Sequence, residues 1–171
     1  MFPEPLHPAV VHFPIVLAVL LPIAGAVALW MIHRGSKPIN AWAPVLAISL
    51  ALTGSAWTAV QSGQHEEDRV EAVVAEAAIE THEEAAELFL PLSAGVLLLM
   101  GGGLLGGRKG QASRVAAVVA AMILVGQGVR VGHSGGELVY VHGAASAYVG
   151  ADAGVRPAPA GEREEHERDQ H

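Results

Sequence analysis

Residues 9–32, AVVHFPIVLAVLLPIAGAVALWMI, form the stretch that decides the fold. No Asp, Glu, Lys or Arg interrupts it. A helix needs roughly 20 predominantly apolar residues to cross the hydrocarbon core of a bilayer, and this run exceeds that length. A cleaved signal peptide would carry a basic region before a shorter apolar run, and this chain has neither. The stretch therefore predicts a retained transmembrane helix.

Three further apolar segments follow, at residues 41–62, 88–107 and 115–129. The first two are long enough to span a membrane alone. The third is short, and we expect Arg114 and Arg130 to snorkel from its ends to the interface. The sequence therefore predicts an all-α integral membrane four-helix bundle, with spans at about 9–33, 41–62, 85–107 and 114–132.

The composition agrees with one membrane domain and limits its chemistry. Of the 171 residues, 51% are hydrophobic and 16% are charged. We assign residues 1–150 to the four-span domain and predict that the acidic, Pro-rich tail at residues 151–171 is disordered. The absence of cysteine excludes disulfides, thiolate metal sites and Fe–S clusters held by this chain. The formal net charge of -7 argues against nucleic acid as a partner.

Basic residues predict the orientation, because loops rich in Lys and Arg stay on the cytoplasmic side of a membrane. Such residues join the first two spans and the last two: Arg34, Lys37, Arg108, Lys109 and Arg114. Both termini and the acidic connection at residues 63–87 are therefore expected outside, which is an N-out, C-out topology. In a bacterium this places the protein in the inner membrane, with the acidic connection on the periplasmic side.

The acidic connection has a helical pattern of its own. Between Asp68 and Glu87, apolar residues recur at helical spacing, with glutamates on the other faces. This pattern predicts an amphipathic helix outside the membrane that leads directly into the third span. Pro91 lacks a backbone donor, so we expect a kink where this helix enters the membrane.

Nine histidines are distributed unevenly over this topology. Only His33 falls at the inner end, and two lie in the tail, at His166 and His171. Six are expected outside, near the ends of different spans: His7, His12, His65, His82, His133 and His142. Polar groups near hydrocarbon are costly unless satisfied, so these imidazoles indicate a shared ligand or a hydrogen-bonded network.

We divide the six outer histidines into two groups. The predicted cofactor ligands are His12, His82, His133 and His142. His7 and His65 are expected to be either further metal ligands or neighbours that hydrogen-bond to the ligands. For each of the six, the alternative is an interfacial side chain without a ligand.

Spacing excludes several familiar sites. A zinc protease helix would need a second histidine four residues after His82, where Ala86 stands. A di-iron carboxylate bundle would need Glu-x-x-His motifs, and Ile79 occupies the position three before His82. The chain also lacks a Gly-rich phosphate loop and a nucleophile with a base and an orienting acid. We therefore expect an electron-transfer or accessory subunit rather than a stand-alone enzyme.

Two stretches resemble a known family. Residues 6–14, LHPAVVHFP, and residues 133–143, HSGGELVYVHG, look like the two signatures of the DUF2231 family of predicted bacterial membrane proteins. The resemblance covers about residues 5–150 and combines both motifs with four spans. The family has no established activity. Its members occur near or fused to cytochrome c and Rieske-type modules, which implies a respiratory or redox setting.

These observations lead to the hypothesis of a b-type cytochrome-like subunit that carries electrons near the outer face of the membrane. Four-helix bundles bind haem through imidazoles on facing helices, and bis-histidine ligation suits electron transfer. Tyr140 and Arg130 would then hydrogen-bond or pair with the haem propionates. The resemblance implies partners such as cytochrome c or Rieske-type proteins within a larger redox complex.

Two alternatives stay open. A copper or zinc ion could replace haem, since neutral imidazole binds both metals. Acidic residues beside the histidines support this alternative: Glu66, Glu67, Glu83 and Glu137. The other alternative is a structural subunit of a membrane complex that binds no cofactor.

Overall fold

The chain forms an antiparallel bundle of four long helices. The computed structural model describes residues 7–149. Within that range it contains α1 (His7–Val10), α2 (His12–His33), α3 (Pro38–Glu71), α4 (Glu76–Gly102), α5 (Gly107–Tyr140) and α6 (Ser146–Val149). The predicted tail at residues 151–171 lies outside the described residues.

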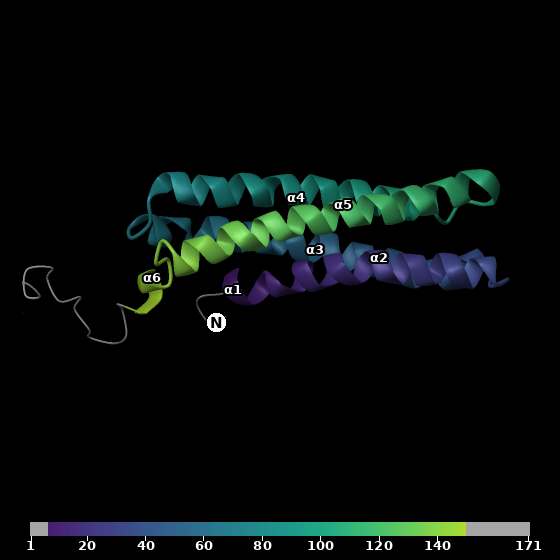
Figure 1. Ribbon diagram of the computed structural model, residues 1–171, viewed down its shortest axis with the longest axis horizontal. Helices are drawn as coiled ribbons and strands as arrows, with labels where there is room; N and C mark the ends of the chain where they lie inside the picture. The colour runs from purple at the N-terminus through teal and green to yellow at the C-terminus, as the bar shows by residue number, and fades with distance from the viewer. Residues whose placement is uncertain (1–6, 150–171) are drawn as a thin grey trace, which may run out of the picture.

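Each long helix packs against two neighbours. α2 contacts α3, α3 contacts α4, α4 contacts α5, and α5 contacts α2, which closes the bundle shown in Figure 1. α2 and α4 therefore occupy opposite corners, as do α3 and α5. The short helix α1 precedes α2 by one residue, Val11, and contacts α3. The predicted all-α four-helix bundle is confirmed.

Apolar side chains cover the outside of the bundle as well as its core. All four long helices are long and apolar enough to cross a membrane. Their outward faces expose large apolar residues, among them Phe13, Leu50, Leu98 and Ile123. A soluble protein rarely exposes so much contiguous apolar surface. The chain is therefore a multi-pass membrane protein.

The core is held by close packing and by hydrogen bonds between helices. Leu21, Trp42, Leu52 and Met100 are completely buried at its centre. Lipid tails are as apolar as these side chains, so contacts between helices contribute more here than the removal of apolar surface from water. Gln127 adds one polar contact, because its buried Nε2 donates to the Ala85 carbonyl at 2.9 Å.

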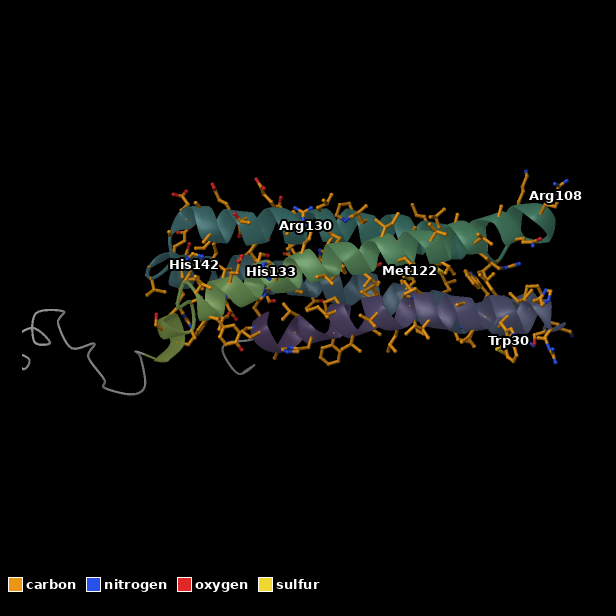
Figure 2. All side chains as sticks on the ribbon, in the orientation of Figure 1. Trp30, Arg108, Met122, Arg130, His133 and His142 are labelled. Atoms are coloured by element: carbon orange, nitrogen blue, oxygen red, sulfur yellow. The ribbon has the colours of Figure 1, made fainter. Side chains whose placement is uncertain are left out.

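The two ends of the bundle differ in chemistry. The end with the turns at residues 34–37 and 103–106 carries Arg34, Lys37, Arg108, Lys109 and Arg114, and we call it the basic end. The opposite end holds α1, the turn at residues 72–75 and α6, and we call it the histidine end. Figure 2 shows Trp30 and Arg108 at the basic end and His133 and His142 toward the other.

The helices continue past the apolar segments at the histidine end. α3 and α5 have 34 residues each. Such a helix is about 51 Å long, against about 30 Å for the hydrocarbon core of a bilayer. The histidine end therefore stands beyond the membrane core.

The prediction of one amphipathic helix over residues 68–87 is wrong in one respect. α3 continues to Glu71, a turn occupies residues 72–75, and only the part from Glu76 leads into the third span. Val74 in this turn is buried against Ile79 and Ala144. The turn thus packs against a distant part of the chain, and the local pattern of apolar residues does not indicate this contact. α4 runs through Pro91 without interruption, so the expected kink stays a prediction.

Arg114 differs from its predicted role. It is only 5% exposed, with Nε donating to the Gly103 carbonyl at 2.7 Å and Nη2 donating to the Leu105 carbonyl at 3.1 Å. The expectation that it snorkels is therefore wrong. α5 already has spanning length from Gly107, and the guanidinium instead satisfies carbonyls left free where α4 ends.

Candidate metal centre

His7 is fixed at the histidine end by contacts with α3. Its Nδ1 lies 2.9 Å from the Ala59 carbonyl oxygen and 3.1 Å from Ser62 Oγ. A carbonyl only accepts hydrogen bonds, so Nδ1 carries the proton and Nε2 keeps its lone pair in the neutral ring. The backbone N–H of His7 donates to Glu66 Oε1 at 3.1 Å. The start of α1 is thus held by α3 through both the ring and the backbone N–H of His7.

His82 is fixed in a similar way by α5. Its Nδ1 lies 3.0 Å from Ser134 Oγ. The Ser134 hydroxyl donates to the Val131 carbonyl at 3.1 Å, so Oγ has only acceptor capacity left for the imidazole. The Nδ1 atom of His82 therefore carries the proton, and its Nε2 also keeps a lone pair.

The two imidazoles lie side by side in the interior. Their ring centroids are 6.3 Å apart, and their planes are inclined by 83°. Both side chains are half-buried and lie outside the four apolar segments. Among the described residues, neither Nε2 has a hydrogen-bond partner. The site thus offers two neutral nitrogen donors that make no hydrogen bond to the described residues.

Electrostatics keep both rings neutral near pH 7. Burial lowers the pKa of His7, against the Ala59 hydrogen bond and the Glu66 charge, which raise it. Burial also lowers the pKa of His82, and the neighbouring His7 lowers it further, against the hydrogen bond to the Val131 carbonyl, which raises it. A metal ion binds neutral imidazole, so these shifts favour ligation at physiological pH.

Two glycines make room for the rings. A Cβ at Gly63 would lie 3.1 Å from Cε1 of His7, and a Cβ at Gly135 would lie 3.1 Å from Cε1 of His82. These distances are shorter than ordinary van der Waals contacts. Each imidazole therefore lies against a helix that is free of a side chain at the point of contact.

A small apolar pocket adjoins the pair. It has a volume of about 60 Å³, and His7 and His82 form part of its wall together with Pro14, Ala56, Phe89 and Gly128. Its remaining lining is also apolar. The pocket is large enough for a metal ion or a few atoms, and much smaller than the roughly 300 to 1,000 Å³ of sites that enclose organic ligands of drug size.

The structure brings together only one of the four predicted cofactor ligands and one of the two neighbours. His82 meets His7, whereas His12, His65 and His142 are exposed. His133 is also exposed, at 76%, with Nε2 3.4 Å from Glu137 Oε1. Since His12 and His133 do not line the pocket of the pair, their assignment as ligands has no support in this geometry.

The residues predicted to pair with haem propionates also lie away from the pair. Tyr140 is 89% exposed, and Arg130 is exposed. Neither lines the pocket beside His7 and His82. His33 is exposed at the basic end.

The acidic residues named beside the histidines have separate surroundings. Glu66 accepts from the His7 backbone and, at Oε2, from the Tyr148 hydroxyl at 2.6 Å. Burial raises the pKa of Glu83, and repulsion from Glu67 and Glu87 raises it further. Within residues 7–149, no three His, Asp or Glu side chains gather closely enough to hold a metal ion. Any metal held by this pair must therefore accept two protein ligands.

The sequence did not indicate which histidines form the pair. One signal was present, namely a Ser-Gly dipeptide in each of the two helices that carry the rings' acceptors, at Ser62-Gly63 and Ser134-Gly135.

No protein-family model, curated protein or solved structure matches the chain.

Proposed function

We propose that the protein binds one copper ion, in the cuprous state, between Nε2 of His7 and Nε2 of His82. The observation that carries this proposal is the spacing of two anchored, neutral imidazoles. Imidazole nitrogen binds a first-row metal at about 2.0 Å, so two rings on opposite sides of one ion have centroids about 6 to 6.5 Å apart. The observed spacing of 6.3 Å agrees with this value.

Three features favour cuprous copper over other ions. Cu(I) accepts two ligands in a line, whereas structural zinc takes four. The pocket is apolar, and a single positive charge costs less to bury there than a double one. The carboxylate of Glu66, bonded to the His7 backbone, supplies a compensating negative charge nearby. These features favour a bound monovalent ion.

A b-type haem is the second candidate, because two histidines from helices at opposite corners are the donors that four-helix bundles use for haem. The donor set therefore fits haem iron. The volume does not, since a macrocycle needs far more space than the pocket of about 60 Å³. Haem would enter only if the helices at the histidine end moved apart.

The wider role follows from the orientation that we propose. The basic end faces the cytoplasm, so the copper site lies on the outer, periplasmic side of a bacterial inner membrane. There the protein would act as an accessory or electron-transfer subunit beside redox proteins, in keeping with the resemblance to DUF2231 members. A structural subunit without a cofactor is the competing class.

Metal analysis and a visible spectrum of the purified full-length protein test this proposal. We expect about one copper per chain after loading with Cu(I), and no haem absorbance. The variants His7→Ala and His82→Ala should each lose the copper, whereas His12→Ala and His133→Ala, at exposed positions of the same end, should keep it. A Soret and α-band pair would instead establish the haem candidate. Wild-type protein that binds neither cofactor would contradict both and leave the structural role.

A further inference from the structure

The two helical hairpins match in dimensions. The first hairpin runs through helical stretches of 27 and 34 residues, at His7–His33 and Pro38–Glu71. The second runs through stretches of the same two lengths, at Glu76–Gly102 and Gly107–Tyr140. Each hairpin begins at the histidine end and returns to it. Membrane proteins with internal repeats show such correspondence even where sequence similarity is weak.

The buried positions of α3 and α5 also match in register. Ser62 and Ser134 are separated by the same number of residues as three other pairs of buried residues in the two helices: Trp42 and Arg114, Val45 and Ala117, Leu52 and Leu124. The same holds for the first helix of each hairpin. The interval between His7 and His82 recurs between Pro14 and Phe89, Ala18 and Ser93, Leu21 and Val96.

The contacts of the two histidines complete the correspondence. In the first hairpin, His7 Nδ1 contacts Ser62, whose hydroxyl donates to the Ala59 carbonyl at 2.9 Å. In the second, His82 Nδ1 contacts Ser134, whose hydroxyl donates to the Val131 carbonyl. The glycine that follows each serine lies against the ring. Each hairpin thus contains a histidine, a serine that donates to a carbonyl of its own helix, and a glycine next to that serine, in the same arrangement.

We propose that the metal centre consists of two equivalent half-sites, one from each hairpin, and that Ser62 and Ser134 are its matched positioning residues. The designation as a metal centre rests on the proposed function, whereas the positioning role concerns the metal-free rings as well. Each serine donates its own proton to a carbonyl and so accepts from Nδ1–H, which leaves Nε2 of each ring as the free donor.

The equivalence has one exception that sharpens the test. His7 Nδ1 also lies 2.9 Å from the Ala59 carbonyl, which can keep its proton in place without Ser62. The Val131 carbonyl, which corresponds to the Ala59 carbonyl, also interacts with the His82 ring and raises its pKa, but the Nδ1 hydrogen bond of His82 is to Ser134, at 3.0 Å. Loss of Ser134 should therefore disturb the tautomer of His82 more than loss of Ser62 disturbs that of His7.

Nitrogen NMR of the imidazoles in the metal-free, full-length protein tests the positioning role directly. Both rings of the wild-type protein should show Nδ1 protonated and Nε2 bare. Ser134→Ala should give His82 a mixture of tautomers, Ser62→Ala should change His7 less, and Ser134→Thr should restore the hydroxyl and the wild-type signal. Ser55→Ala is the matched control, because Ser55 also bonds back to a carbonyl, that of Leu52, without contacting either ring.

Copper titration then connects the positioning role to the metal. Removal of a residue that orients a metal-ligating histidine typically costs about 10- to 100-fold in metal affinity, and we expect a loss of that size for Ser134→Ala and none for Ser55→Ala. Wild-type rings protonated at Nε2, or tautomers unchanged in Ser134→Ala, would overturn the inference. Correct tautomers in a protein that binds no copper would overturn the proposed function alone.

Discussion

The imidazoles of His7 and His82 meet with centroids 6.3 Å apart and planes inclined by 83°. They do so although α2, which follows His7, and α4, which carries His82, lie at opposite corners of the bundle. Each ring reaches the interior by lying against a third helix, α3 for His7 and α5 for His82. The pair therefore depends on the packing of all four long helices. A small displacement of either supporting helix would change the spacing of the two Nε2 atoms.

The glycines beside the rings give the first prediction. Gly63→Ala and Gly135→Ala place a methyl group 3.1 Å from an imidazole Cε1, so each should displace its ring and weaken copper binding by about 10-fold or more. Alanine favours a helix over glycine by roughly 0.5 to 1 kcal/mol, so thermal stability should not fall. Isothermal titration with Cu(I) and thermal unfolding measure the two effects.

Matched controls for these variants lie in the same helices. A Cβ at Gly54 in α3 or at Gly132 in α5 would meet nothing within 4 Å. Gly54→Ala and Gly132→Ala should therefore keep wild-type copper affinity. Equal affinity in all four variants would show that the rings are not held against the helices as described.

The lowered pKa values of the two histidines predict a pH dependence of stability. Because burial lowers the pKa of both rings in the folded protein, the unfolded chain binds protons there at a higher pH, and stability rises with pH across that interval. As the pH falls below about 6.5, the ordinary histidine value, the folded protein should lose stability, and the loss is complete below the lowered pKa values.

Thermal unfolding of the metal-free protein in detergent, between about pH 5 and about pH 8, measures this dependence. A His7→Gln, His82→Gln double variant has no titrating ring at the pair and should show a flatter profile. A profile as steep as that of the wild type would assign the pH dependence to other groups.

The orientation gives a third prediction. Because the chain has no cysteine of its own, variants with a single introduced cysteine can test it. Ala72 lies in the turn at the histidine end and Gln111 lies near the start of α5 at the basic end, and both are exposed. On intact cells whose outer membrane has been opened, a membrane-impermeant maleimide should label Ala72→Cys and not Gln111→Cys. Labelling of Gln111→Cys alone would mean that the histidine end faces the cytoplasm.

The sequence was sufficient to predict the four helices, but not which face of each helix points into the bundle. Apolar length determines a membrane-spanning helix almost alone, which is why the spans could be predicted. In α2, however, apolar residues surround the whole helix, because lipid and neighbouring helices accept the same side chains. The pattern around His12 therefore carried no sign that His12 faces outward while His7, one and a half turns earlier, contacts α3.

The break between α3 and α4 at residues 72–75 and the burial of Arg114 were missed for a related reason. Residues 72–75 continue the helical spacing of their neighbours, and the turn there packs through Val74 against Ala144, far along the chain. Arg114 resembles any basic residue at the end of a span, and only the course of the turn at residues 103–106 brings carbonyls within its reach. The first feature is set by a contact with a distant segment, and the second by the course of the adjacent turn.

Arg114 gives the last prediction. Arg114→Ala removes donors from the carbonyls of Gly103 and Leu105 at a site where the side chain was 5% exposed. Hydrogen bonds from charged donors contribute about 1.5 to 3 kcal/mol, so we expect a loss of about 2 to 3 kcal/mol in the free energy of unfolding. Arg114→Lys keeps the charge but not the planar fork, and should recover only part of that loss.

The matched control is Arg108→Ala, because Arg108 is an exposed residue of the same end, and exposed substitutions usually change stability by less than about 0.5 kcal/mol. Reversible unfolding in mixed detergent micelles compares the three variants. Since Arg114 lies at the opposite end from the histidine pair, copper affinity should stay at the wild-type value in all of them. A loss of stability in Arg108→Ala as large as that in Arg114→Ala would show that the net charge of the basic end, and not the bonds to the two carbonyls, stabilises the turn between α4 and α5.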